Sequence, residues 1–293
     1  MAAEVLYFIS DTHLADGSGA DQFRYPRQLM DLLVRIESDP HAQLVLLGDF
    51  LELWAAALEG VLTYHAPIVR MVGQIAATHP VTYVVGNHDC LPWYYYIGQS
   101  AGSIRVAERF TNRRGNLVAI HGHQYDPFNR VDVTDEGQVK APWTRKLVEA
   151  VGLIERVGGV PAGEAIARLG DTLTRAAGSL ERLVPHWDQA SREAVGHGLT
   201  QAKAMLERQS PGERGYPDGE MAYEEAARSL MREGAQYVLM GHTHHPLVRK
   251  YGSRLYVNTG SWVWDRYPPT YGRYAGGKLE LLDGNTHQPF AAG

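Results

Sequence analysis

The chain has 293 residues, of which 44% are hydrophobic and 21% charged, and its formal net charge is −5. This composition is typical of a soluble globular protein, and the acidic balance argues against nucleic-acid binding. The single cysteine excludes an intrachain disulfide and a cysteine-based zinc site, so any metal would be held by carboxylates and by some of the 13 histidines.

The N-terminal sequence MAAEVLYFIS predicts a first strand rather than a targeting segment. It has no basic region, and its apolar run from Val5 to Ser10 is too short for a signal peptide. No stretch approaches the roughly 18 consecutive apolar residues that a membrane-spanning helix needs. We therefore expect a cytoplasmic protein.

Short apolar runs recur along the chain, and each ends in a cluster of polar residues or in a glycine-led turn. They are VLYFISDTH, QLVLLGDF, VTYVVGNHD, NLVAIHGHQ and, much later, QYVLMGHTHH. Runs of this length are typical of strands buried on both faces of a sheet. Between the early runs, Leu29, Leu32, Leu33 and Ile36 have helical spacing. Strands that alternate with helices predict the α/β class.

The region from residue 141 to 235 breaks this alternation. Apolar residues have amphipathic helical spacing from Ala141 to Gln209, the segment SPGERGYPDGE interrupts the pattern, and a further helix is predicted over Glu220 to Glu233. We expect a single domain over residues 1–293 that carries this mostly helical insertion. The sequence leaves open whether the insertion is a lid or a dimerisation element, and it does not predict the oligomeric state.

In α/β sheets the ligand crevice lies outside the carboxyl ends of the strands. The polar clusters would meet at that edge and collect the side chains of Asp11, His13, Asp49, Asn87, His88, His121, His242 and His244. Mixed imidazole and carboxylate ligands suit zinc, manganese, iron or nickel better than calcium. Because the ligands exceed what one ion needs, we expect a two-metal site with Asp49 as the bridging group.

The motifs DTH, GD, GNHD, HGH and GHTH, in this order over residues 11 to 244, resemble the signature of the calcineurin-like metallophosphoesterases. The resemblance implies two packed mixed sheets flanked by helices, an αββα sandwich, with a dinuclear site at one edge. It implies two divalent ions, with manganese favoured and iron, zinc or nickel as alternatives. One ion would be held by Asp11, His13, Asp49 and His244, and the other by Asp49, Asn87, His121 and His242.

The same resemblance implies that the chain hydrolyses a phosphoester or pyrophosphate bond. Two ions about 3.5 to 4 Å apart lower the pKa of a bridging water, and the resulting hydroxide attacks phosphorus directly. His88 would stabilise a phosphoryl oxygen or protonate the leaving oxygen. Asp89 would orient the imidazole of His88 and raise its pKa, and Gly86 would allow a sharp exit from the strand.

The segment GDFLELW and the long insertion resemble the UDP-2,3-diacylglucosamine pyrophosphatase branch of the family, which cleaves a lipid-linked diphosphate. That branch holds acyl chains in its insertion, where any peripheral membrane contact would also occur. The chain departs from the branch in two ways: HGH with His123 stands where the branch has HGD, and no acidic pair follows Trp54. His123 and Asp126 are candidate substrate contacts.

Other activities remain alternatives to a lipid diphosphatase. One is a phosphodiesterase or phosphatase that acts on nucleotides, cyclic nucleotides or phosphoproteins. A nuclease is disfavoured by the acidic charge. A noncatalytic scaffold is disfavoured because every ligand implied by the resemblance is present.

Overall fold

The computed structural model describes residues 4–18, 21–90, 97–101, 103–126, 129, 132–133, 139–140, 217–263 and 267–290. Apart from Pro217, these residues belong to one of the two units into which the chain divides, Met1–Lys140 with Asp218–Gly293. Residues 141–216, which hold most of the predicted helical insertion, lie outside the described residues.

The first sheet has a parallel centre and antiparallel edges. Its strands follow the order β14 (Lys278–Asp283), β13 (Thr270–Ala275), β1 (Val5–Ile9), β2 (Ala42–Leu47), β3 (Val81–Val84), β5 (Ile104–Ala107) and β4 (Ser100–Ala101). Strands β1, β2, β3 and β5 pair in parallel, whereas β13, β14 and β4 pair antiparallel. The parallel strands therefore bring their carboxyl ends to one edge.

The second sheet also has parallel strands at its centre and antiparallel strands at its edges. Its strands follow the order β11 (Leu247–Tyr251), β12 (Arg254–Asn258), β10 (Tyr237–Met240), β7 (Leu117–Ile120) and β6 (Arg109–Thr111). Strands β12, β10 and β7 are parallel, and the two edge strands are antiparallel. A separate two-stranded sheet pairs β8 (Asp132–Val133) with β9 (Val139–Lys140).

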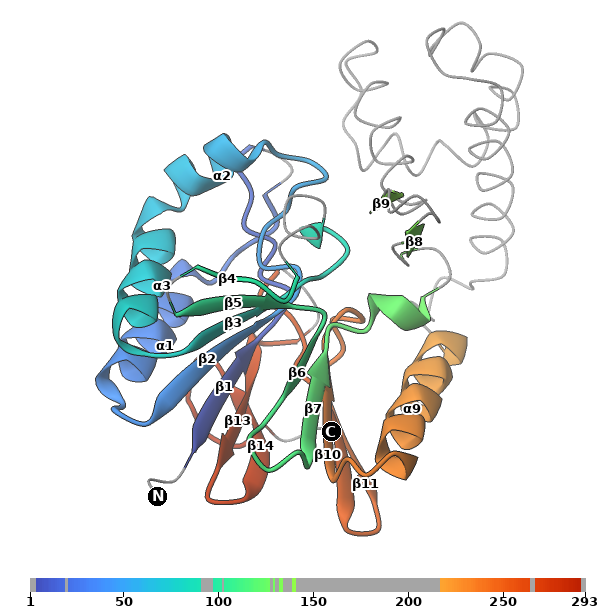
Figure 1. Cartoon of the computed structure of the whole chain (residues 1–293). Helices are drawn as coiled ribbons and strands as arrows, with labels where there is room; N and C mark the ends of the chain where they lie inside the picture. Colours follow the sequence, from blue (N-terminus) through green and yellow to red (C-terminus); the bar gives the residue numbers. More distant parts are fainter. Residues whose placement is uncertain are drawn as a thin grey trace, which may run out of the picture. The chain divides into compact units, whose positions relative to one another are not determined.

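Helices lie on the outer face of each sheet (Figure 1). The first sheet is covered by α1 (Pro26–Ser38), α2 (Leu58–Tyr64) and α3 (Ala66–Thr78), and the second by α9 (Pro217–Arg232). The buried residues of α1 are the predicted ones, Leu29, Leu32, Leu33 and Ile36. Helix α9 begins three residues before the predicted start at Glu220 and ends one residue before Glu233. None of the helices in the described ranges is long and apolar enough to span a membrane.

Three apolar clusters separate these layers. Strand β1 illustrates the division, because Tyr7 and Ile9 pack toward α1 while Leu6 and Phe8 pack between the two sheets. The third cluster joins the second sheet to α9 and includes Val238 of β10. Alternate residues of one strand thus enter different cores, which explains the continuous apolar runs. The predicted αββα sandwich is confirmed.

Candidate metal centre

Five residues that follow strand ends share a left-handed backbone conformation. Asp11, His13, Asp49, His242 and His244 have φ between 46° and 69°. A residue with a side chain pays about 1–3 kcal/mol for such a conformation, and it persists only where the surrounding structure fixes it. In the described part of the chain, His287 is the only other residue besides glycine with positive φ. The strain is therefore concentrated at the side chains that the sequence analysis selected as metal ligands.

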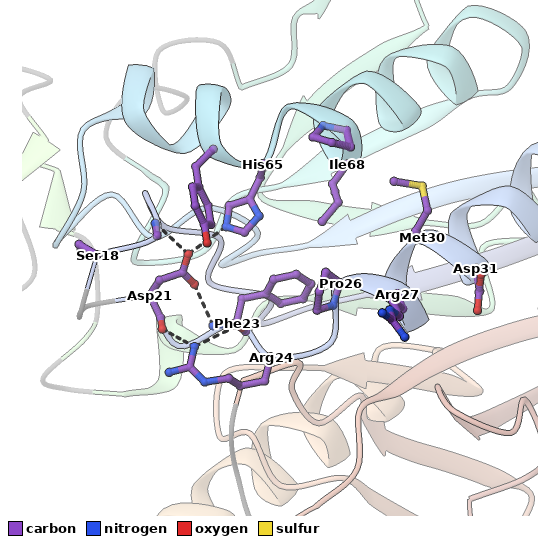
Figure 2. Close-up of a pocket in the computed structure, with 13 residues that line it drawn as sticks. Ser18, Asp21, Phe23, Arg24, Pro26, Arg27, Met30, Asp31, His65 and Ile68 are labelled. Carbon is purple, nitrogen blue, oxygen red and sulfur yellow. Dashed lines mark hydrogen bonds and ion pairs between the residues drawn. The ribbon is translucent and has the colours of Figure 1, made fainter.

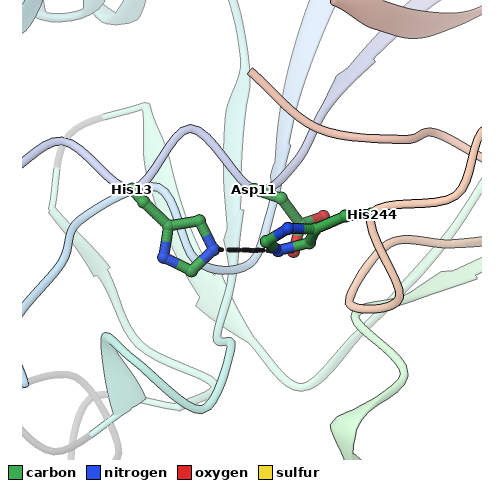
Figure 3. A group of neighbouring side chains, drawn as sticks. All are labelled: Asp11, His13 and His244. Atoms are coloured by element: carbon green, nitrogen blue, oxygen red, sulfur yellow. Dashed lines mark hydrogen bonds and ion pairs between the residues drawn. The ribbon is translucent and has the colours of Figure 1, made fainter. Parts of the chain in front are cut away.

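The first group of candidate ligands combines Asp11, His13 and His244 (Figure 3). Nε2 of His13 lies 3.1 Å from Nε2 of His244, and Oδ1 of Asp11 lies 3.4 Å from the latter nitrogen. Nδ1 of His13 lies 2.9 Å from Oε2 of Glu52, so this nitrogen carries the proton and leaves the lone pair on Nε2. Two imidazole nitrogens and a carboxylate oxygen thus converge on one point.

The second group combines Asp49, His121 and His242. Nδ1 of His121 lies 2.9 Å from the backbone oxygen of Leu47, and its Nε2 lies 3.1 Å from Oδ2 of Asp49. Nε2 of His242 lies 3.1 Å from Oδ2 of Asp126, which leaves its Nδ1 as the ligand atom. Acceptors of this kind fix the tautomer and ring orientation of metal-binding histidines.

The carboxylate of Asp49 lies between the two groups. Its Oδ2 is 3.1 Å from Nε2 of His121 in the second group and 3.9 Å from Nε2 of His13 in the first. Burial by itself raises the pKa of Asp49, but the charges of His121 and His88 outweigh burial and hold this pKa well below its usual value. Asp49 is therefore ionised and placed to serve both groups.

Asn87 adds an oxygen with no partner. Its side chain is buried, and Oδ1 has no hydrogen-bond partner in the described part of the chain. An unsatisfied buried oxygen costs about 1–3 kcal/mol, which a bound cation would relieve. Carboxylate, imidazole and amide oxygen together form a donor set suited to manganese, iron or zinc. The residues present therefore fit divalent cations.

Two glycines let the backbone approach the carboxylates. A Cβ atom at Gly86 would lie 2.1 Å from Oδ1 of Asp49, and one at Gly241 would lie 2.3 Å from Oδ2 of Asp11. We expected Gly86 to allow a sharp exit from the strand; a glycine here also meets a steric need, although its φ is not among the positive values. It is required because no larger residue fits beside Asp49.

His88 is held by two residues that the sequence analysis did not assign. Nδ1 of His88 lies 2.6 Å from Oε2 of Glu52, and its ring stacks on Trp54 with centroids 3.7 Å apart. Nε1 of Trp54 donates to the backbone oxygen of Asn87 at 2.9 Å. Burial by itself lowers the pKa of His88, but the charges of Glu52 and Asp49 outweigh burial and raise it. The side chain keeps 21% of its surface exposed, so it is oriented yet accessible.

The structure corrects the expected contact between Asp89 and His88. The carboxylate of Asp89 accepts hydrogen bonds from the backbone nitrogens of Gly86 (2.8 Å) and Phe50 (2.9 Å) and from the hydroxyl of Tyr83 (2.7 Å). It thereby fixes the loops after β2 and β3. The carboxylate beside the imidazole of His88 is Glu52 instead, because Glu52 lies on the neighbouring loop and faces the ring.

His123 and Asp126 lie against the second group of ligands. Asp126 contacts Nε2 of His242 at 3.1 Å, and the ring of His123 lies 5.5 Å from that of His121. Both side chains are buried. Burial holds the pKa of His123 well below its usual value, so this imidazole is neutral. In the structure, Asp126 orients a candidate ligand, His242.

A comparison with protein families decides the identity of the fold. The model of the calcineurin-like phosphoesterases matches residues 5–246. The chain belongs to the calcineurin-like phosphoesterase family. The resemblance based on the motifs is thus confirmed, and the chain is a metal-dependent phosphoesterase.

Individual relatives of this calcineurin-like phosphoesterase are distant. A UDP-2,3-diacylglucosamine hydrolase of Ralstonia nicotianae is 23% identical over 283 residues, which cover 95% of this chain and 90% of the relative. Among solved structures, the phosphoesterase Yfce of E. coli is 15% identical with a TM-score of 0.43, over 98% of this chain and 97% of that one. The phosphopantetheinyl hydrolase of Mycobacterium tuberculosis is 16% identical with a TM-score of 0.36, over 100% and 99%. At these values neither solved structure bears on the substrate.

Proposed function

We propose that this phosphoesterase works with two divalent cations that share Asp49. The observation that carries the proposal is the position of Asp49 Oδ2, 3.1 Å from His121 and 3.9 Å from His13, one imidazole from each group of ligands. An ionised carboxylate there offsets the charge of two cations. Oδ1 of Asn87, which has no hydrogen-bond partner among the described residues, supports a cation on the side of the second group.

Two bound cations would neutralise the phosphoryl oxygens and lower the pKa of a water between them. The chain contributes a proton donor at a defined place. His88 lies beside the first group, with its ring centroid 4.6 Å from that of His13. The charges of Glu52 and Asp49 raise its pKa and so favour the imidazolium form, and the stacking on Trp54 fixes its plane. In this proposal His88 donates a hydrogen bond to a phosphoryl oxygen or a proton to the leaving oxygen.

For the substrate we propose a nucleotide-linked lipid diphosphate. The supporting observation is the relative named UDP-2,3-diacylglucosamine hydrolase, which matches across 95% of the chain. The amphipathic sequence of residues 141–209 is then the candidate segment for binding the acyl chains.

The test uses metal-free protein reloaded with Mn²⁺ and offered a lipid diphosphate, a phosphomonoester, bis(p-nitrophenyl) phosphate and a cyclic nucleotide. We expect hydrolysis that requires metal, with the highest kcat/KM for UDP-2,3-diacylglucosamine. Metal analysis of the active protein should give about two ions per chain. Full activity with a single ion per chain would refute the dinuclear proposal. Turnover of the small diester with none of the lipid diphosphate would refute the substrate proposal alone.

A further inference from the structure

A cavity of about 750 Å³ lies between the loop that follows β1 and the helices α1 and α3 (Figure 2). Sites for small organic molecules usually measure about 300–1,000 Å³. None of the residues that line it belongs to either group of metal ligands. The cavity is thus of ligand size and separate from the metal centre.

The floor of the cavity is apolar. Phe23 and Ile68 belong to the core between α1, α3 and the first sheet, and Met30 packs against that core. Phe23 also meets the ring of His65 edge to face, with centroids 5.5 Å apart. A ligand that fills the cavity would therefore bury apolar surface.

Tyr64 offers an aromatic platform at the wall of this cavity. A Cβ atom at Gly17 would lie 2.3 Å from Cε2 of Tyr64, so the ring lies directly on the glycine backbone. His65 supports the ring from the side at 4.9 Å, with the planes at 90°. The side chain of Tyr64 nevertheless keeps 60% of its surface exposed. A rigidly held and exposed aromatic ring is suited to stack on a planar group.

The buried charges beneath the cavity are already paired. Oδ2 of Asp21 lies 3.0 Å from Nε2 of His65 and accepts from the backbone nitrogen of Gly17 at 3.1 Å. Oδ1 accepts from the backbone nitrogen of Phe23 at 3.1 Å. Asp21 therefore holds the loop in place and has little capacity to bind a ligand.

Two arginines at the rim, Arg24 and Arg27, differ from Asp21 because they form no ion pair among the described residues. Nη1 of Arg24 donates to the backbone oxygens of Asp21 and Phe23, which fixes one side of the guanidinium. Within the described ranges, neither Arg24 nor Arg27 forms an ion pair with a carboxylate. The carboxylate of Asp31 also lines the rim, and it offsets only one of the two positive charges. Guanidinium groups bind carboxylates and phosphates through paired N–H donors.

We propose that this cavity binds a planar organic anion, with its ring on Tyr64 and its phosphate or carboxylate on a guanidinium group of the rim, that of Arg24 or that of Arg27. An apolar floor alone would accept any hydrophobic molecule. Guanidinium groups beside a fixed aromatic ring select a molecule that carries both a ring and an oxyanion. Nucleoside monophosphates and aromatic carboxylates share this chemistry.

Isothermal titration of the full-length protein tests the proposal with four probes: uridine 5′-monophosphate, 2-naphthoate, uridine and inorganic phosphate. Titrations are run on the metal-loaded protein and on a metal-free Asp49→Asn variant, in which the metal centre no longer attracts anions. We expect one or both ring-bearing anions to bind the metal-free variant, and to bind the cavity of the metal-loaded protein with the same affinity, apart from any additional binding at the metal centre. The tighter binder of the two indicates the source of the ligand, a nucleotide or an aromatic carboxylate. Uridine and phosphate alone should bind about tenfold more weakly or not at all.

Substitutions in the cavity give the second half of the test. Tyr64→Ala and the double change Arg24→Ala with Arg27→Ala should each weaken binding about tenfold or more. Tyr64→Phe, which keeps the ring, and Arg70→Ala, an exposed arginine of α3 outside the cavity, should leave affinity unchanged. Since all these side chains are exposed, circular dichroism should show folded variants. The proposal fails if no ring-bearing anion binds at millimolar concentration, if binding requires Asp49, or if the alanine variants bind as the parent does.

Discussion

The carboxylate of Glu52 lies 2.6 Å from Nδ1 of His88. The same Oε2 lies 2.9 Å from Nδ1 of His13, so one carboxylate orients a candidate metal ligand and the candidate proton donor together. Burial by itself raises the pKa of Glu52, but the charges of the two histidines outweigh it and lower this pKa, so Glu52 remains ionised. Glu52 is thus a positioning residue for both sides of the proposed reaction.

Replacement of Glu52 by glutamine should lower kcat/KM by about 10- to 100-fold, as is typical when a group that orients a metal ligand is changed. It should also alter the pH profile. Glu52 raises the pKa of His88, so its removal lowers that pKa. If the imidazolium is the active form, activity is lost as pH rises through the pKa of His88. The falling limb of the profile should therefore move to lower pH, as measured by initial rates across a buffer series.

The control is Glu59→Gln, which neutralises an exposed glutamate of α2. It should leave both the rate and the pH profile unchanged. A Glu52→Gln enzyme that is slower at every pH, but whose falling limb has not moved, would mean that Glu52 acts only through the structure of the loop.

His88→Ala should keep its metal and lose most of its turnover. The imidazole contacts Glu52 and Trp54, and it groups with His13 and Glu52, but it belongs to neither of the two groups that are proposed to hold the cations. General acid catalysis and stabilisation of an oxyanion are each worth about 10²–10⁴ in rate. We expect a fall of that size in kcat, with metal content by mass spectrometry equal to that of the parent. His41→Ala, at an exposed histidine, is the matched control. Normal turnover in a metal-loaded His88→Ala enzyme would exclude a catalytic role for His88.

Measured metal content should distinguish Asp49, the ligand proposed to be shared by both cations, from ligands such as His244 that bind one cation only. Asp49→Ala removes a carboxylate that faces His13 and His121, and we expect it to lose both ions. His244→Ala removes one nitrogen of the first group, and we expect it to keep about one ion per chain. His287→Ala is the control, because His287 also has a left-handed backbone but lies outside both groups. If Asp49→Ala retained one tightly bound ion, Asp49 would belong to one ion only.

The fold can be predicted from the sequence because local patterns of apolar residues encode its strands and helices. Apolar runs and helical spacing mark β1 and α1, and the carboxyl-end rule brings residues as distant as Asp11 and His242 together, where the backbone nitrogen of His242 donates to Oδ2 of Asp11 at 3.0 Å. The partner of His88 could not be found this way. The family resemblance implied Asp89, the next residue in the chain, but a carboxylate next to an imidazole in sequence need not face it in space. Glu52 does face it, and the only signal was an acidic residue three positions after Asp49 in GDFLELW.

The close contact between Gly241 and the carboxylate of Asp11 predicts that a larger residue at position 241 disturbs the proposed metal centre. Gly241→Ala would place a methyl group 2.3 Å from Oδ2 of Asp11 and 2.6 Å from Oγ of Ser10, both on buried side chains. Asp11 must move, so we expect metal content and activity to fall and the protein to be destabilised by about 1–3 kcal/mol. Gly73→Ala is the matched control, since nothing lies within 4 Å of its Cβ position in α3. It should be stabilised by about 0.5–1 kcal/mol in urea unfolding and keep full activity. Unchanged metal content in a folded Gly241→Ala protein would show that Asp11 can shift without loss of the site, and that its close contact with the glycine is not required.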